Sequence, residues 1–188
     1  GKLPFNLQPY APTNLDQYHL GLYALTGSLQ VIAEIPAHQA LLWMTQTLNG
    51  ICGLGVMIFL YKRVSPLAGL TGMLVVGLLS FQPALYFSWG RFTQGSSQSI
   101  LLIAAFATWE TIKTWKEDYK ENRLSVWALT GLSAMLIAGV FLIHFKAAAY
   151  LLPLLGVICI YELALTIKKK GQWLRTLLSI AAIGIVCI

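Results

Sequence analysis

The sequence predicts an all-α protein: a bundle of about six membrane-spanning helices, with one further helix on the outer membrane surface. Hydrophobic residues make up 57% of the chain and charged residues only 11%, about half the usual charged fraction of soluble domains. All but three of the 13 Lys and Arg residues fall into three short clusters, each at the end of a long apolar run. The clusters are Lys62 and Arg63; Lys113, Lys116, Lys120 and Arg123; and Lys168, Lys169, Lys170 and Arg175.

The basic clusters also predict how the bundle is oriented. Loops rich in Lys and Arg face the cytoplasm in most membrane proteins, so all three clusters are expected on that side. The net charge of +6 is then explained by topology and by anionic lipid headgroups, and no nucleic-acid partner is expected. The three remaining basic residues, Lys2, Arg91 and Lys146, are left on the outer side.

The first helix is predicted over residues 18–34, after an external loop segment formed by residues 1–17. Its polar residues recur at helical spacing, which is typical of an amphipathic helix; they are His19, Tyr23, Thr26 and Gln30. From Leu20 to Ala33 it would rise about 21 Å, less than the roughly 30 Å of membrane hydrocarbon. An interfacial helix is therefore favoured, and a short span with its polar stripe against neighbouring helices is the alternative.

The transmembrane bundle is predicted over residues 36–188. Its spans alternate in direction so that every basic cluster falls on the cytoplasmic side. They run from Ala37 to Tyr61, from Pro66 to about Leu85, from about Gln98 to Thr114, from Leu124 to Ile143, from Ala147 to Thr166, and onward from near Gln172. A polar line of Gln39, Gln46 and Asn49 is expected to face other helices. Glu110 and Glu162 are expected at the membrane interface, paired with a nearby Lys and not buried.

Polar residues gather at the predicted outer face. They are Asp16 and His19 at the interfacial helix; Tyr86, Ser88, Trp89, Arg91, Thr93 and Gln94 in the loop after the second span; and His144 and Lys146 in the tight turn after the fourth. Arg offers a planar fork of donors and Lys a point charge, and both suit a phosphate or diphosphate at headgroup level. The alternative is that Arg91 and Lys146 extend to lipid headgroups beside interfacial aromatic residues.

Four short motifs, taken in their order along the chain, resemble the GT-C superfamily of integral-membrane glycosyltransferases. They are Tyr18-His19-Leu20-Gly21, the span end Lys62-Arg63, the loop Ser88-Trp89-Gly90-Arg91-Phe92-Thr93-Gln94, and His144-Phe145-Lys146. The chain is most similar to the bacterial branch related to protein mannosyltransferases and aminoarabinose transferases. The likeness covers most of residues 9–167, and order and spacing carry it more than identity does.

The resemblance implies a bacterial cytoplasmic-membrane protein that uses a sugar carried on a polyprenyl phosphate, with a divalent metal in some branches. It also implies that Arg91 and Lys146 bind the lipid phosphate, with Gln94 in the same loop, while His19 and His144 line the cavity. The family's catalytic acid lies in its first external loop. Asp16 is a weak candidate for it, as the only acid in the matching stretch, and the role of helix N-cap is favoured over catalysis.

Departures from the family leave a second hypothesis open. The family's first span and most of its first external loop would precede Gly1, so this chain is not expected to turn over a donor by itself. His-Leu-Gly also replaces His-Pro-Pro, and Lys146 stands where Arg is common. The alternative is a non-catalytic subunit in a larger membrane complex, whose small residues serve close helix packing; they include Gly69, Gly72, Ala134 and Gly139.

Metal, pigment and transport functions find less support in the residues. No two histidines have the spacing of a metal pair, and a lone histidine is more often a hydrogen-bonded structural residue than a haem or chlorophyll ligand. The cysteines lie far apart in apolar runs, as small core residues do. A transporter would carry charged residues at mid-membrane depth, and the spans contain none there.

Overall fold

The computed structural model describes residues 20–79, 91–117, 123–166 and 172–186, and every regular element within these ranges is a helix. The helices are α1 (Gly21–Ala33), α2 (Ala37–Arg63), α3 (Pro66–Leu74) continued by the π-helix η2 (Val75–Leu79), α5 (Phe92–Glu117), α6 (Arg123–Ile143), α7 (Phe145–Thr166) and α8 (Gln172–Val186). The predicted all-α bundle is confirmed.

Local sequence signals set several helix ends. Pro36 precedes α2 with an extended backbone, and proline cannot continue a helix from the preceding turn. Ser65 caps α3, since its hydroxyl accepts a hydrogen bond from the Ala68 amide at 3.1 Å, and Pro66 takes the first helical position. Lys62 and Arg63 occupy the last turn of α2, where the helix dipole favours positive charge.

In the part of the chain that the structure describes, three helices are both long enough and apolar enough to span a membrane: α2, α6 and α7. They contain 27, 21 and 22 residues, and at about 1.5 Å per residue each crosses the roughly 30 Å hydrocarbon layer. These helices coincide with the predicted first, fourth and fifth spans and indicate a membrane protein. The α3–η2 segment and α8 are shorter apolar helices, and α5 has 26 residues but a more polar sequence.

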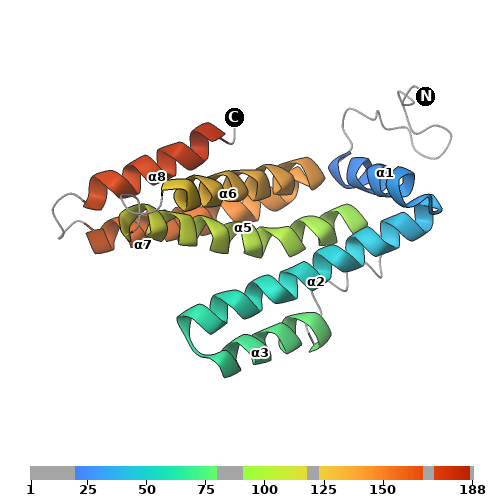
Figure 1. Cartoon of the computed structure of the whole chain (residues 1–188), viewed down its shortest axis with the longest axis horizontal. Helices are drawn as coiled ribbons and strands as arrows, with labels where there is room; N and C mark the ends of the chain where they lie inside the picture. Colours follow the sequence, from blue (N-terminus) through green and yellow to red (C-terminus); the bar gives the residue numbers. More distant parts are fainter. Residues whose placement is uncertain (1–19, 80–90, 118–122, 167–171, 187–188) are drawn as a thin grey trace.

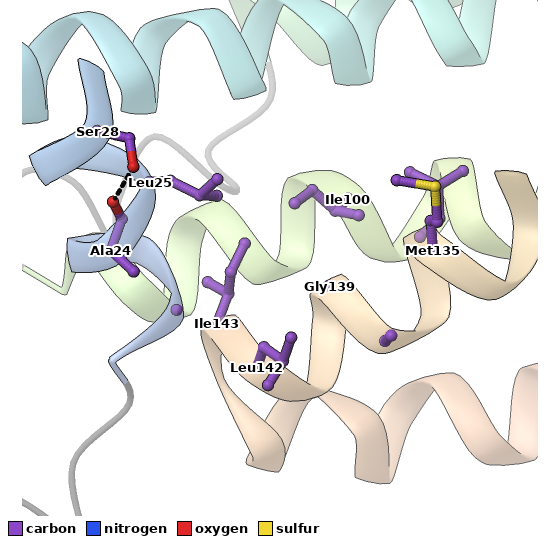
Figure 2. A pocket seen from close by; sticks show the side chains of 11 residues that line it. Ala24, Leu25, Ser28, Ile100, Met135, Gly139, Leu142 and Ile143 are labelled. Carbon is purple, nitrogen blue, oxygen red and sulfur yellow. Dashed lines mark hydrogen bonds between the residues drawn. The ribbon is translucent and has the colours of Figure 1, made fainter. Parts of the chain in front are cut away.

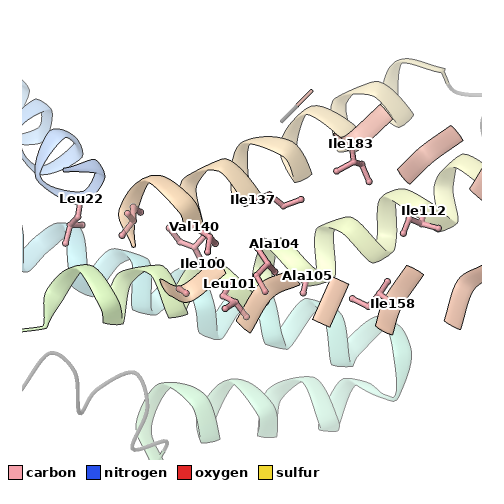
Figure 3. Close-up of a cluster of buried hydrophobic side chains, with 13 residues drawn as sticks. Leu22, Ile100, Leu101, Ala104, Ala105, Ile112, Ile137, Val140, Ile158 and Ile183 are labelled. Carbon is pink, nitrogen blue, oxygen red and sulfur yellow. The ribbon is translucent and has the colours of Figure 1, made fainter. Parts of the chain in front are cut away.

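The polar character of α5 follows from its place in the bundle. It packs against α2, α6, α7 and α8, and lies in the middle of the molecule (Figure 1). Its side chains form the centre of the buried cluster in Figure 3, where Ile100, Ala104 and Ile112 meet residues of the surrounding helices. A helix enclosed by others does not need an apolar surface on every side, so Ser and Thr are tolerated if they find hydrogen-bond partners.

Those partners lie on α6. The hydroxyl of Ser97 donates to the Val140 carbonyl oxygen at 3.0 Å, and the Thr111 and Ser133 hydroxyls lie 2.8 Å apart. The indole N–H of Trp115 donates to the Thr130 hydroxyl at 3.0 Å. Hydrogen bonds between membrane helices contribute about 0.6 kcal/mol on average and up to about 1.7 kcal/mol. This row of polar contacts fixes the register of α5 against α6.

Small residues bring α3 close to α2, as close helix packing requires. A Cβ atom at Gly69 would lie 2.8 Å from the Met57 carbonyl oxygen, and one at Gly72 would lie 2.3 Å from a methyl group of Leu60. Ala134 is buried as well. Gly139 differs from these three, because a Cβ atom there would meet nothing within 4 Å.

Two predicted polar stripes are oriented only in part as expected. On α1, Tyr23 and Gln30 are exposed, but Thr26 is buried together with Leu22. Thr26 tolerates burial because its hydroxyl donates to the Leu22 carbonyl oxygen at 2.8 Å. On α2, Gln39 and Gln46 are exposed, so among the described residues only Asn49 of that predicted line turns toward the bundle.

Candidate functional site

The predicted site residues that the structure describes lie at the end of the bundle where α5 and α7 begin. Arg91 immediately precedes α5 and is exposed, and Gln94 is in the first turn of that helix. His144 is the single residue joining α6 to α7, and 8% of its surface is exposed. Lys146 is the second residue of α7 and is exposed. Asp16, His19, Tyr86, Ser88 and Trp89 fall outside the described residues.

Two details of the predicted loops are wrong. Thr93 and Gln94 belong to α5, which begins at Phe92 and not near Gln98. Lys146 belongs to α7 and not to the turn before it. The hydroxyls in this stretch made it resemble a loop, yet two of them find partners in the bundle: Ser97 donates to the Val140 carbonyl oxygen at 3.0 Å and Ser99 to the Gly95 carbonyl oxygen at 3.1 Å.

The Val140 carbonyl oxygen links the start of α5 to the turn between α6 and α7. It accepts the Ser97 hydroxyl at 3.0 Å and the His144 backbone N–H at 3.0 Å. The His144 carbonyl oxygen in turn accepts the Ala147 amide at 2.9 Å, so α7 starts directly after the turn. The beginning of α5, with Arg91 one turn before its buried serines, therefore lies beside the turn that carries His144.

An apolar pocket of about 550 Å³ lies between α1, α5 and α6. Figure 2 shows Leu25 of α1, Ile100 of α5, and Gly139 and Ile143 of α6 around it. Gly21 also lines the pocket, at the point where α1 contacts the end of α6. Since Ile143 immediately precedes His144, this apolar space reaches the polar end of the bundle. No local sequence pattern indicates this pocket, because its walls come from three separate helices.

A group of charged residues joins four helices at the opposite end of the bundle. We call it the charged clamp; it comprises Lys62 and Arg63 of α2, Trp109, Glu110 and Lys116 of α5, Glu162 of α7, and Arg175 of α8. Lys62 and Arg63 bind the two oxygens of Glu110 at 3.1 and 2.7 Å. The Arg63 guanidinium also lies over the Trp109 ring, 5.2 Å from its centroid, a favourable cation–π position.

The predicted pairing of Glu110 and Glu162, and the predicted exposure of Glu162, are wrong. Glu162 is 2% exposed and is among the largest fully buried side chains of the described residues. It forms an ion pair with Lys116 and accepts a hydrogen bond from the Trp109 indole. Arg175 then donates to the Lys116 carbonyl oxygen at 3.2 Å. Within the described ranges, neither glutamate pairs with a lysine nearby in sequence. The sequence feature that could have indicated the contacts of Glu162 is the spacing of Trp109 and Lys116, which are seven residues apart and therefore lie on one face of α5.

The described residues do not gather three His, Cys, Asp or Glu side chains as a metal site would need. Comparisons of the chain with protein families, with curated proteins and with solved structures found no match.

Proposed function

We propose that this chain is part of a GT-C-like membrane glycosyltransferase and binds the polyprenyl-phosphate portion of a lipid-linked sugar donor. The observation that carries the proposal is a large apolar pocket whose α6 wall runs up to Ile143, the residue before His144 and three positions before the exposed Lys146. A polyprenyl phosphate has the same two parts, a long apolar chain and a charged head. The pocket would take the chain, and Arg91 and Lys146 would hold the phosphate, with Gln94 and His144 near it.

This arrangement suits the chemistry of sugar transfer. The bond that breaks joins the anomeric carbon of the sugar to a phosphate oxygen, and the phosphate leaves with the electron pair. The acceptor supplies the new bond to that carbon and loses a proton to a base. Cations placed beside the phosphate stabilise the negative charge that develops on it. In this proposal the described residues bind and orient the donor, and the catalytic acid or base lies outside them.

The proposed orientation places the charged clamp on the cytoplasmic side of a bacterial cytoplasmic membrane and the pocket on its outer side. Lys62 and Arg63 end α2, Lys116 lies near the end of α5, and Arg175 lies near the start of α8. The clamp contacts bring members of all three basic clusters to one end of the bundle. Basic residues gathered at one end are what the positive-inside rule requires of a cytoplasmic side.

Binding of a polyprenyl phosphate tests the function. Arg91→Gln and Lys146→Gln are each expected to weaken binding about tenfold, because a charge-assisted contact to phosphate contributes about 1.5–3 kcal/mol. Lys146→Arg should retain binding. The measurement is titration of the purified chain in nanodiscs with a polyprenyl phosphate, followed by tryptophan fluorescence. Arg123→Gln, which removes a charge from the other end, is the control; equal loss in this variant would contradict the proposed site.

A variant that fills the apolar pocket tests separately whether the pocket binds the polyprenyl chain. Gly139 lines the pocket and has no neighbour within 4 Å of an added Cβ atom. Gly139→Leu should therefore fold normally and weaken binding of a long polyprenyl phosphate at least fivefold, with little effect on a short-chain analogue. Gly131→Leu is the matched control, since Gly131 lies on the same helix, has the same open surroundings and is not part of the pocket. Equal affinity for long and short chains in both variants would show that the pocket is not used.

A second function, as a non-catalytic subunit of a larger membrane complex, is favoured by one observation. Gln46 is exposed on α2, about 14 Å along a helix long enough to span the membrane. An amide facing hydrocarbon is costly unless another helix offers hydrogen-bond partners. If wild-type protein does not bind polyprenyl phosphate, and Gln46→Leu abolishes a stoichiometric membrane complex, the subunit function replaces the enzymatic one.

A further inference from the structure

A small polar pocket lies at the clamp end, distant from the proposed donor site. Its volume is about 280 Å³, and its walls come from α2 and α5. Every lining residue is polar or charged: Lys62, Arg63, Glu110, Lys113, Thr114 and Glu117. Helix α2 is about 40 Å long and exceeds the hydrocarbon thickness by about 10 Å. The last turn of α2, and the pocket with it, therefore fall at the level of lipid headgroups.

The charges around this pocket are not balanced. Glu110 is a single carboxylate shared by two cations, Lys62 and Arg63. Lys113 forms no ion pair with any residue in the described ranges, and Glu117 is exposed at the end of α5. The lining residues together carry three positive and two negative charges. An excess of one positive charge matches the single negative charge of a phosphodiester.

Arg63 is already ordered for binding an anion. One of its nitrogens binds Glu110, its planar face lies over Trp109, and its Nε atom is buried and makes no hydrogen bond among the described residues. A guanidinium held in place loses little further freedom when a ligand binds. The cation that can complete a phosphate site is Lys113, which contributes a positive charge not used by Glu110.

We propose that this pocket binds the phosphate of an anionic phospholipid headgroup. A lipid source is favoured over free phosphate because the site is at the end of a helix longer than the hydrocarbon layer, and because α2 presents exposed Ile58 one turn before Lys62, where an acyl chain would run. The bound lipid would neutralise the excess charge and seal the α2–α5 contact from the membrane side. The inference is independent of the proposed glycosyltransferase function, which concerns the other end of the bundle.

Lipid retention measured by native mass spectrometry tests the proposal. The full chain is purified from mixed vesicles of phosphatidylglycerol and phosphatidylcholine, and the lipid that stays bound after detergent exchange is counted. We expect one phosphatidylglycerol per chain and no retained phosphatidylcholine. Lys113→Gln should reduce retention about fivefold, since a basic residue near the surface contributes about 1 kcal/mol of attraction to anionic lipid. Lys113→Arg should restore retention.

The control is Arg123→Gln, which removes one positive charge from an exposed position at the same end, outside the pocket. Equal losses in Lys113→Gln and Arg123→Gln, or equal retention of both lipids by wild-type protein, would overturn the proposal in favour of diffuse attraction. If inorganic phosphate displaces the lipid at millimolar concentration and binds delipidated protein equally well, the site takes a free anion instead. Lys113→Gln leaves every clamp contact intact, and an unchanged thermal unfolding temperature checks its folding.

Discussion

Replacement of Glu162 by Gln is expected to lower the free energy of unfolding by about 3–5 kcal/mol, the usual effect of removing one partner from a buried ion pair. Glu162 is 2% exposed, and the side chain of its partner Lys116 is 9% exposed. Gln can still accept the Trp109 indole hydrogen bond, so the variant isolates the loss of charge. The uncompensated ammonium of Lys116 would then remain in a site with little access to water. Reversible unfolding in mixed micelles, followed by circular dichroism, measures the change.

The double variant Lys116→Met/Glu162→Gln separates charge from packing. Removing both charges relieves the desolvation cost on each side, so most of the lost stability should return. Glu117→Gln is the single-charge control, because Glu117 is exposed on the same helix and its replacement should change stability by less than about 0.5 kcal/mol. If Glu162→Gln and Glu117→Gln have the same small effect, the ion pair is not buried in the membrane-embedded protein.

Replacement of Gly21 by Ala should detach the start of α1 from the end of α6. An added Cβ atom would lie 2.5 Å from the Leu142 carbonyl oxygen and 2.9 Å from the Ile143 nitrogen, and both are backbone atoms that cannot rotate away. Overpacking of this kind typically costs about 1–3 kcal/mol. Because Gly21 also lines the apolar pocket, we expect the variant to weaken polyprenyl-phosphate binding about tenfold. Unfolding and titration in nanodiscs measure the two effects.

Gly27→Ala is the matched control for this variant. Gly27 lies on the same helix, and an added Cβ atom there meets nothing within 4 Å. Alanine is favoured over glycine inside a helix by up to about 1 kcal/mol, so this variant should be as stable as the wild type or slightly more stable. A loss of stability in Gly27→Ala as large as that in Gly21→Ala would mean that α1 responds to any substitution and not to contact with α6.

The sequence predicted the outer helices of the bundle well because charges and prolines mark their ends. The predicted spans from Ala37 to Tyr61 and from Leu124 to Ile143 differ from α2 and α6 by no more than two residues at either end. Helix α5 was predicted less well. Its first turns carry several serines, of which Ser97 and Ser99 donate to carbonyl oxygens inside the bundle, and composition alone does not distinguish such a helix from a polar loop.

The candidate site could be predicted only in part. The sequence indicated Arg91, Gln94, His144 and Lys146, and the structure places all four at one end of the bundle. It did not indicate the apolar pocket or the burial of Glu162, because both depend on which helices become neighbours. Glu162 and Lys116 are 46 positions apart in the sequence, and a local pattern contains no information about such a contact.

The same separation determines when the charged clamp can form. Its contacts between helices join residues 46 to 59 positions apart, and none can be made while the helices are still entering the bilayer one at a time. Membrane helices insert individually and associate afterwards. Loss of the clamp should therefore leave insertion and topology unchanged and produce an inserted chain with loosely associated helices. Quality-control proteases that extract poorly assembled membrane proteins would recognise this species, so the cellular abundance of clamp variants should fall even where their membrane targeting is normal.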